Sequence, residues 1–214
     1  MPVFVEKGAV LMGGLDETGL LEEGEVFVQV SKRDPENPSR LIHRIITGFV
    51  MVTKHPALHA GDVRMLRAVD HPHLRNQKNV ILFSQHGDRP EADKMSGSDL
   101  DGDQFAVTWD DRLFLQGPNH VPLDFKAPTS AAAPVMPTNA REHDKALVEH
   151  FVNHLMNDKV GRIAMLWLDY ASRYGANYTK CVELAKLHSI AVDFPKSGIP
   201  AILPRELLPP PDFK

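Results

Sequence analysis

The feature that most constrains the fold is a run of prolines in the middle of the chain. Within residues 117–138 they stand at Pro118, Pro122, Pro128, Pro134 and Pro137, around Ser130-Ala131-Ala132-Ala133. Because proline fixes φ and lacks a backbone N–H, this stretch can form neither a regular strand ladder nor an uninterrupted helix. We therefore expect a linker at residues 117–138, between a first domain at residues 1–116 and a second at residues 139–214.

The segment before the linker has the pattern of short β-strands. Residues 25–31 alternate apolar with polar side chains and are bounded by Gly24 and by Asp34-Pro35, as in a half-buried strand. Comparable runs are residues 8–12, which end at a Gly13-Gly14 turn, and residues 45–54, 63–69, 79–85 and 104–109. Several short strands at this spacing predict a β-barrel or a β-sandwich.

The segment after the linker has helical periodicity instead. Apolar side chains recur at Leu147, Phe151, Leu155 and Met156 and again at Ile163, Trp167 and Tyr170. A further helix is expected over residues 179–192, with Thr179 as its N-cap, before a proline-rich tail from Pro195. The sequence therefore predicts an α+β chain, in which a small helical module follows the strands.

Composition excludes several other classes of protein. The only cysteine, Cys181, lies among apolar residues of an expected helix, so a disulfide framework within the chain is excluded and a place in the core is favoured. The chain has no apolar run near the ~20 residues that a membrane span needs, so we expect no membrane partner. We expect an intracellular protein, and the sequence does not resolve nucleus from cytoplasm.

Charge is distributed unevenly along a chain whose net charge is only -4. Residues 54–78 carry five Lys and Arg against two Asp, whereas residues 84–111 carry eight Asp and Glu against two Lys and Arg. A basic stretch followed by carboxylates suits an enzyme that acts on polyanions through metal ions. Two solvated loops would give the same composition, and that alternative stays open.

The carboxylates concentrate in one short loop, in which Asp99, Asp101 and Asp103 stand at i, i+2 and i+4. On a flat strand the outer two would lie roughly 13 Å apart, too far for a single ion. Gly102 permits a tight turn that brings the three carboxylates together, and Gly97 frees the entry to the loop. Because three adjacent anions repel one another, a divalent cation is expected there, and oxygen ligands indicate Mg²⁺, Mn²⁺ or Ca²⁺.

A calcium loop of the EF-hand type is the alternative for these aspartates. Counting from Asp99, acids fall at positions one, three, five and twelve. However, position six should be Gly and is Gln104, and a strand pattern rather than a helix follows the loop. The sequence therefore favours a catalytic metal loop.

Asp99-Leu100-Asp101-Gly102-Asp103 resembles the catalytic Asp-x-Asp-Gly-Asp of the cellular RNA-dependent RNA polymerases of eukaryotic RNA silencing. The resemblance extends in order over residues 11–19, 24–31, 52–56 with 58–64, 68–70 and 191–198. It implies a double-psi β-barrel in which Asp99, Asp101 and Asp103 bind Mg²⁺, with Mn²⁺ as a substitute, and catalyse nucleotidyl transfer from nucleoside triphosphates to an RNA 3′-hydroxyl. In such a reaction one ion activates the hydroxyl and another stabilises the pyrophosphate.

The resemblance also implies binding partners. Single-stranded RNA template, RNA product and nucleoside triphosphates are expected, with their phosphates held by Lys54, Arg64 and Lys196. The basic stretch would add RNA affinity without reading sequence. Because the family's enzymes are longer, a second double-psi barrel that this chain lacks is expected to complete the active site.

Two other interpretations stay open. One is the corresponding barrel of the large subunit of a DNA-dependent RNA polymerase, although residues 96–100 and 191–198 are closer to the silencing enzymes. The other is a noncatalytic remnant that binds metal or RNA without turnover.

Overall fold

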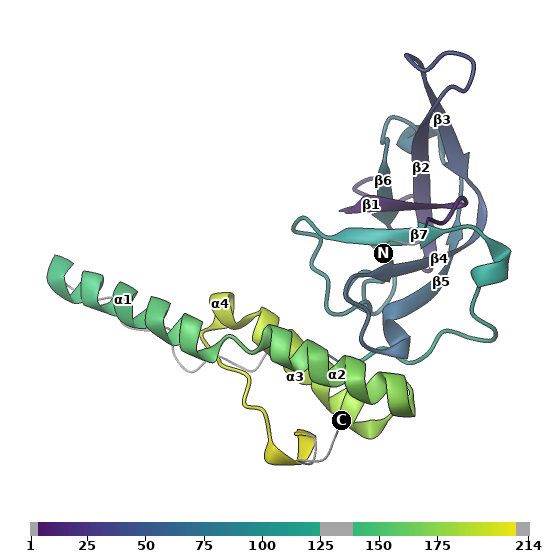
Figure 1. Ribbon diagram of the computed structural model, residues 1–214. Coiled ribbons are helices and arrows are strands. Elements are labelled where there is room, and N and C mark those ends of the chain that lie inside the picture. Colours follow the sequence, from purple (N-terminus) through teal and green to yellow (C-terminus); the bar gives the residue numbers. More distant parts are fainter. Residues whose placement is uncertain (1–3, 125–138, 209–214) are drawn as a thin grey trace. The chain divides into compact units, whose positions relative to one another are not determined.

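The computed structural model describes residues 4–124 and 139–208 (Figure 1). Contacts within the chain divide it into two compact units, Met1–Asp124 and Phe125–Lys214. Residues 117–124 of the expected linker form neither helix nor strand, and residues 125–138 lie outside the described residues. The predicted domain limits at residues 116 and 139 stay predictions.

The first unit is a closed β-barrel. Its described strands are β1 (Gly8–Leu15), β2 (Glu25–Arg33), β3 (Leu41–Ile46), β4 (Gly48–Lys54), β5 (Val63–Ala68), β6 (Val80–Phe83) and β7 (Gln104–Thr108). The order β2-β5-β4-β7-β1-β6 closes because β6 also pairs with β2. The pairs β1–β6 and β2–β5 are parallel and the other pairs are antiparallel. Closure confirms the barrel and excludes the sandwich.

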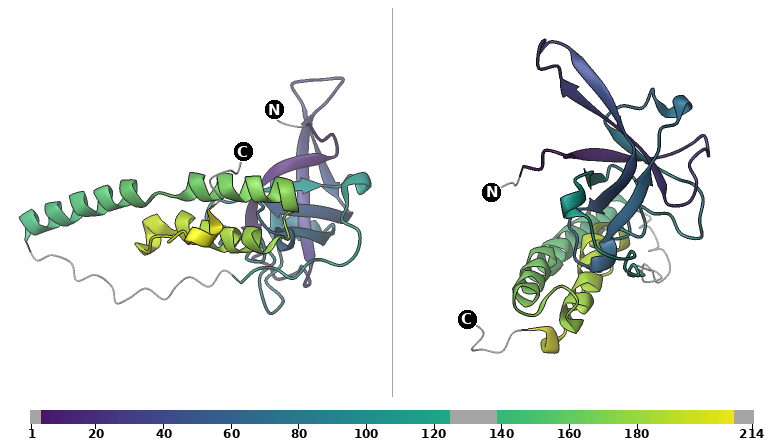
Figure 2. Two further views of the ribbon diagram at one scale, coloured as in Figure 1. Left: turned by 60° about the horizontal axis from the view of Figure 1, so that its bottom comes forward. Right: turned by 90° about the vertical axis from the view of Figure 1, so that its right-hand side faces the viewer.

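The remaining strand, β3, stands outside the closed ring. It pairs with β2 from Val28↔Ile46 to Arg33↔Leu41, and the two strands form a hairpin that extends beyond the barrel (Figure 2). The first four of its six residues, Leu41 to Arg44, are exposed. The hairpin therefore contributes little to the core.

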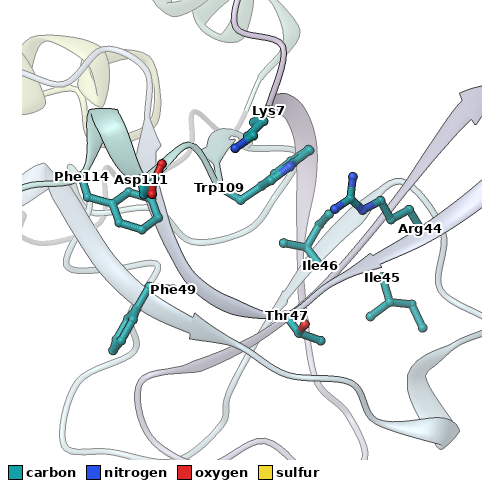
Figure 3. A pocket seen from close by; sticks show the side chains of 9 residues that line it. All are labelled: Lys7, Arg44, Ile45, Ile46, Thr47, Phe49, Trp109, Asp111 and Phe114. Carbon is teal, nitrogen blue, oxygen red and sulfur yellow. The ribbon is translucent and has the colours of Figure 1, made fainter.

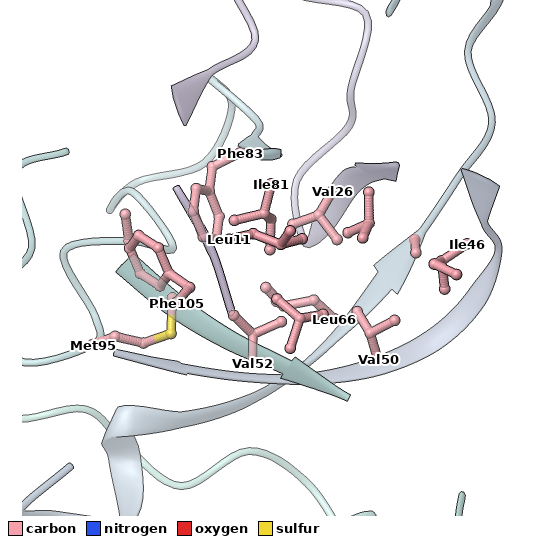
Figure 4. Packing of buried hydrophobic residues seen from close by; sticks show 14 of the residues in the cluster. Leu11, Val26, Ile46, Val50, Val52, Leu66, Ile81, Phe83, Met95 and Phe105 are labelled. Carbon is pink, nitrogen blue, oxygen red and sulfur yellow. The ribbon is translucent and has the colours of Figure 1, made fainter. Parts of the chain in front are cut away.

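Alternating side chains of several strands fill the barrel (Figure 4). Val26, Val28 and Val30 point inward from β2, as the two-residue period of a strand requires, and all are buried. The Phe83 and Phe105 rings pack with centroids 4.9 Å apart. β2 is buried on its other face as well, because Phe27 packs with Leu21, Leu74 and Leu82.

Two strand predictions were wrong. Residues 45–54 were expected to form one strand, but the chain turns between β3 and β4, where Gly48 has φ +99°. The expected turn at Gly13-Gly14 is instead part of β1. Gly13 allows close packing there, since a Cβ on it would clash with the Phe105 ring.

The second unit is helical, as predicted. Its described helices are α1 (Ala140–Asn157), α2 (Val160–Tyr174), α3 (Thr179–Val192) and α4 (Phe194–Ser197). Helices α2 and α3 pack side by side around a core that includes Ile163, Tyr170, Leu184 and the buried Cys181 (Figure 2). Residue Thr179 begins α3 rather than capping it, because the N-cap is Tyr178, whose side chain makes no capping bond. No helix among the described residues is long and apolar enough to cross a membrane.

Candidate metal centre

Three carboxylates converge in the loop that leads into β7. One oxygen from each of Asp99, Asp101 and Asp103 can be chosen so that all three lie within 4.8 Å of one another. Asp99 and Asp101 are exposed, and Asp103 is partly buried. The loop therefore presents its carboxylates to solvent from a base that is fixed to the barrel.

The backbone of the loop reaches this shape through left-handed conformations. Gly97 has φ +67°, Leu100 has φ +62° and Gly102 has φ +129°. A Cβ on Gly102 would meet nothing within 4 Å, so this position requires glycine for its backbone angle rather than for space. Leu100 accepts the unfavourable angle while its side chain packs against the barrel core.

The buried carboxylate of Asp62 holds the entrance of the loop. One of its oxygens accepts hydrogen bonds from the backbone N–H groups of Leu58 (3.0 Å) and His59 (2.9 Å), and the other accepts one from Ser96 (3.0 Å). Asp62 has no exposed surface. Asp62 therefore connects the turn before β5 to Ser96, at the start of the loop that carries the three aspartates, called the metal loop below.

The far end of the loop is tied to β1 and β4. The Gly13 N–H donates to the Asp103 carbonyl at 3.0 Å. On the side chain of Asp103, Lys54 Nζ lies 2.8 Å from Oδ1, and Ser98 Oγ donates to Oδ2. Burial raises the pKa of Asp103, but the hydrogen bonds from Lys54 and Ser98 outweigh burial and hold that pKa below its usual value. Asp103 is therefore ionised at neutral pH.

The donor set fits a divalent cation with oxygen ligands. For ligand bonds of about 2.0–2.6 Å, oxygens on opposite sides of an ion stand about 4–5 Å apart, which matches the spread of the three carboxylates. The ammonium group of Lys54 already lies against one of them, so the cluster attracts positive charge. Asp99, Asp101 and Asp103 are the residues that would hold the ion.

The basic residues expected to bind phosphate lie in different places. Lys54 stands at the triad. Arg64 is only 7% exposed, and its guanidinium donates to Glu91 at 3.2 Å and to the His120 carbonyl at 3.0 Å. Lys196 lies in α4 of the helical unit, and its side chain is outside the described residues. Phosphate binding by these residues stays a prediction, and the buried ion pair of Arg64 does not favour it.

Sequence reasoning missed the roles of Asp62 and Ser98. Asp62 lies 34 residues before Ser96, to which its carboxylate is bonded, and no local pattern marks that contact. Ser98 directly precedes Asp99 in the sequence, so its hydroxyl could have been recognised as a hydrogen-bond donor to one of the aspartates. Neither contact could be derived without the barrel that brings the segments together.

The first unit is a closed β-barrel that carries three converging aspartates, and their carboxylates could hold a metal ion. The family described as "RNA dependent RNA polymerase" matches residues 1–214. The chain belongs to this RNA-dependent RNA polymerase family.

Individual relatives agree with this assignment. The chain is 40% identical over 228 residues to "Probable RNA-dependent RNA polymerase SHL2" of Oryza sativa subsp. japonica, covering 99% of this chain and 18% of that protein. It is 41% identical over 210 residues to "RNA-dependent RNA polymerase 1" of Arabidopsis thaliana, covering 96% and 18%. The chain therefore spans less than a fifth of the length of these two relatives.

A solved structure has the same fold. The "RNA dependent RNA polymerase QDE-1 from Thielavia terrestris" superposes with a TM-score of 0.69 at 24% identity, covering 95% of this chain and 23% of that one. The match extends over nearly the whole of this chain, barrel and helices included. It confirms the predicted fold, a double-psi β-barrel followed by a helical module.

Proposed function

We propose that this chain is the catalytic barrel segment of an RNA-dependent RNA polymerase that acts in RNA silencing. The reaction would transfer nucleotides from nucleoside triphosphates to the 3′-hydroxyl of an RNA strand growing on an RNA template. The convergence of Asp99, Asp101 and Asp103 carries the proposal. Membership of the polymerase family over residues 1–214 supports it and favours it over a DNA-dependent enzyme.

The proposed cation is Mg²⁺, with Mn²⁺ as a substitute, because the three donors are carboxylates. When bound, it would supply Lewis-acid activation of a hydroxyl and neutralise charge on phosphate oxygens. Asp99, Asp101 and Asp103 would hold it, and Gly102 and Leu100 shape the loop that carries these aspartates. Lys54 lies at the edge of the cluster, where its ammonium group can donate to a triphosphate or RNA phosphate oxygen.

The proposed active site also requires a second domain that faces the aspartate cluster. Asp99 and Asp101 are exposed, so the barrel presents the cluster on an open surface. A polymerase must exclude water from the reacting phosphate and hold template and triphosphate in line. We infer that a second double-psi barrel, carried elsewhere in the longer protein or on a separate chain, faces this surface and supplies further basic residues.

Nucleotide incorporation tests the proposal. A single-stranded RNA template, labelled nucleoside triphosphate and Mg²⁺ or Mn²⁺ are mixed with this chain alone or with a candidate partner barrel. We expect incorporation with the partner and its loss in Asp101→Ala. If no combination incorporates nucleotide although the folded chain binds Mn²⁺, the catalytic proposal fails and a noncatalytic metal-binding remnant is the better description.

A further inference from the structure

A second potential binding site lies on the barrel unit, apart from the aspartates. A cavity of about 340 Å³ opens between the base of the β2–β3 hairpin and the end of β7 (Figure 3). Its lining includes three aromatic rings, Phe49, Trp109 and Phe114, and two cations, Lys7 and Arg44. One carboxylate, that of Asp111, also lines it.

The position of the cavity follows from the strands. Asp103 directly precedes β7, and Trp109 directly follows it. Trp109 lies six positions after Asp103 in the chain, so at ~3.3 Å per residue the cavity is about 20 Å from the triad along the strand. The same strand therefore links two sites that are too far apart to share one ligand atom.

The aromatic rings are presented in a way that suits stacking. The backbone N–H of Trp109 donates to the Lys7 carbonyl at 2.9 Å, and the Trp109 side chain, which is partly buried, packs against the barrel core. The packing restrains the indole and leaves part of it exposed. Phe49, at the start of β4, is 65% exposed, so a large apolar ring faces solvent beside the cavity.

The two basic side chains of the cavity, Lys7 and Arg44, could bind an anionic ligand. Among the described residues, neither Lys7 nor Arg44 forms an ion pair, although Lys54, Arg64, Arg75, Arg89, Lys94 and Arg112 all do. The nearby Asp110 is already held by two hydrogen bonds from the Arg112 guanidinium, at 2.9 and 2.6 Å. Figure 3 shows Lys7 and Arg44 on either side of the Trp109 ring.

The hairpin extends this positive charge. Residues 32–44 carry four bases, Lys32, Arg33, Arg40 and Arg44, against two acids, Asp34 and Glu36, in a chain of net charge -4. Lys32, Arg33, Arg40 and Arg44 are all exposed. A basic arm beside fixed aromatic rings is the combination that binds single-stranded nucleic acid without sequence preference.

We propose that this cavity and the β2–β3 hairpin bind single-stranded RNA. One base stacks on Trp109 or Phe49, and Lys7 and Arg44 contact the adjoining phosphates. The proposal rests on the proposed function for the choice of RNA as the ligand. At 3.4 Å per stacked nucleotide, about six nucleotides would bridge the cavity and the triad, so the site would hold a strand that extends beyond the reacting end.

Binding of a 12-nucleotide single-stranded oligouridylate to the 214-residue chain tests the proposal, with EDTA present so that no metal at the triad contributes. In Lys7→Ala/Arg44→Ala we expect affinity to fall about tenfold at low salt. The slope of log affinity against log salt should fall by about 1.4, which corresponds to two lost phosphate contacts. Arg162→Ala/Lys186→Ala removes the same charge from exposed positions on α2 and α3 and should leave affinity nearly unchanged.

Tryptophan fluorescence locates the bound base. The chain has two tryptophans, so Trp167→Phe leaves Trp109 as the reporter. We expect saturable quenching of Trp109 by the oligouridylate. Unchanged affinity in the Lys7/Arg44 variant, an equal loss in the Arg162/Lys186 control, no RNA binding or no quenching would each overturn the proposal.

The same samples separate this proposal from the catalytic one. Asp101→Ala should keep RNA quenching of Trp109, whereas Lys7→Ala/Arg44→Ala should keep Mn²⁺ binding at the triad. Loss of RNA quenching in Asp101→Ala, or loss of Mn²⁺ binding in Lys7→Ala/Arg44→Ala, would contradict the separation of the two sites.

Discussion

Lys54 already balances part of the charge at the aspartate cluster. Its ammonium group lies 2.8 Å from Asp103 Oδ1, and the two side chains are only 20% and 14% exposed. An ion pair this sheltered is screened less by water than one on the surface. The lysine and a bound cation would therefore neutralise the same carboxylate.

We predict that Lys54→Met destabilises the metal-free chain by about 1–2 kcal/mol, between the values for exposed and buried pairs. With saturating Mn²⁺ the loss should be smaller, because the ion takes over the charge of Asp103. Urea unfolding with and without Mn²⁺ measures both values. The exposed Lys186→Met is the matched control, and an equal loss in both conditions would contradict the account.

The buried carboxylate of Asp16 stabilises the turn after β1. It accepts hydrogen bonds from Thr18 N (3.0 Å), Leu20 N (2.8 Å) and Leu21 N (2.9 Å), as well as from the Thr18 hydroxyl. Burial raises its pKa, but these bonds outweigh burial and hold the pKa of Asp16 in the folded chain below its usual value. The unfolded chain therefore binds the proton more tightly than the folded chain does.

The sign of the pH dependence follows from this difference. The stabilisation due to Asp16 is fully present above the unfolded pKa of about 3.9 and is lost as pH falls through the lower folded pKa. We predict that Asp16→Asn costs about 1–3 kcal/mol at pH 7, because a buried acceptor is lost. The gap between wild type and variant should shrink at pH 3 in urea unfolding, and a gap independent of pH would count against this role.

At the scale of elements, the metal loop depends on its neighbours. Asp62 joins the turn before β5 to Ser96, while Gly13 of β1 joins the other end at Asp103. A change at either anchor should move the carboxylates relative to one another. Metal affinity should therefore respond to residues that never touch the ion.

Asp62→Asn tests this dependence. An amide has one acceptor oxygen in place of two, so at least one of the three N–H groups loses its partner, at a cost of about 1–3 kcal/mol. We predict weaker Mn²⁺ binding by several-fold in a chain that still folds. Asp88→Asn removes an exposed carboxylate from the same unit and should change neither quantity, and Mn²⁺ affinity unaltered by Asp62→Asn would show that the anchor is only structural.

The sequence predicted strands where one face is buried and failed where none is. In β7 the buried Phe105 and Val107 alternate with less buried neighbours, as expected. β2 was predicted from the inward side chains of Val26, Val28 and Val30, although Phe27 on its other face is buried too. β3 was missed as a strand because Leu41 to Arg44 are exposed and its ladder is with β2 alone. Hydrophobic periodicity reports burial rather than pairing, so a projecting hairpin gives no signal.

The helix α3, in contrast to β3, has a buried face and was predicted from the sequence. Cys181, Leu184, Ala185, His188 and Ala191 are buried at helical spacing. The predicted helix is confirmed and ends at Val192 as observed, but it begins one residue earlier than Thr179 as N-cap implies. Its N-cap was wrong because a Thr at the boundary suits both the cap and the first helical position. Capping depends on one hydrogen bond, which periodicity does not show.

For the whole molecule, the parts of the candidate site formed within one short segment could be predicted from the sequence, and the parts formed by segments far apart in the chain could not. The convergence of three aspartates was predicted from Gly102, because the geometry of a five-residue loop is local. The pairing of Lys54 with Asp103 was not predicted, because barrel closure brings together residues 49 positions apart. The cavity at Lys7 and Trp109 likewise depends on chain segments that meet only in the folded barrel.

Mn²⁺ binding, followed by electron paramagnetic resonance, tests the central claim most directly. The claim is that Asp99, Asp101 and Asp103 form a divalent-cation centre. We predict saturable binding to the 214-residue chain, competition by Mg²⁺, and a loss of at least tenfold in affinity in Asp101→Asn but not in the exposed Asp88→Asn. Equal Mn²⁺ affinity in wild type and in a folded Asp101→Asn chain would contradict the account.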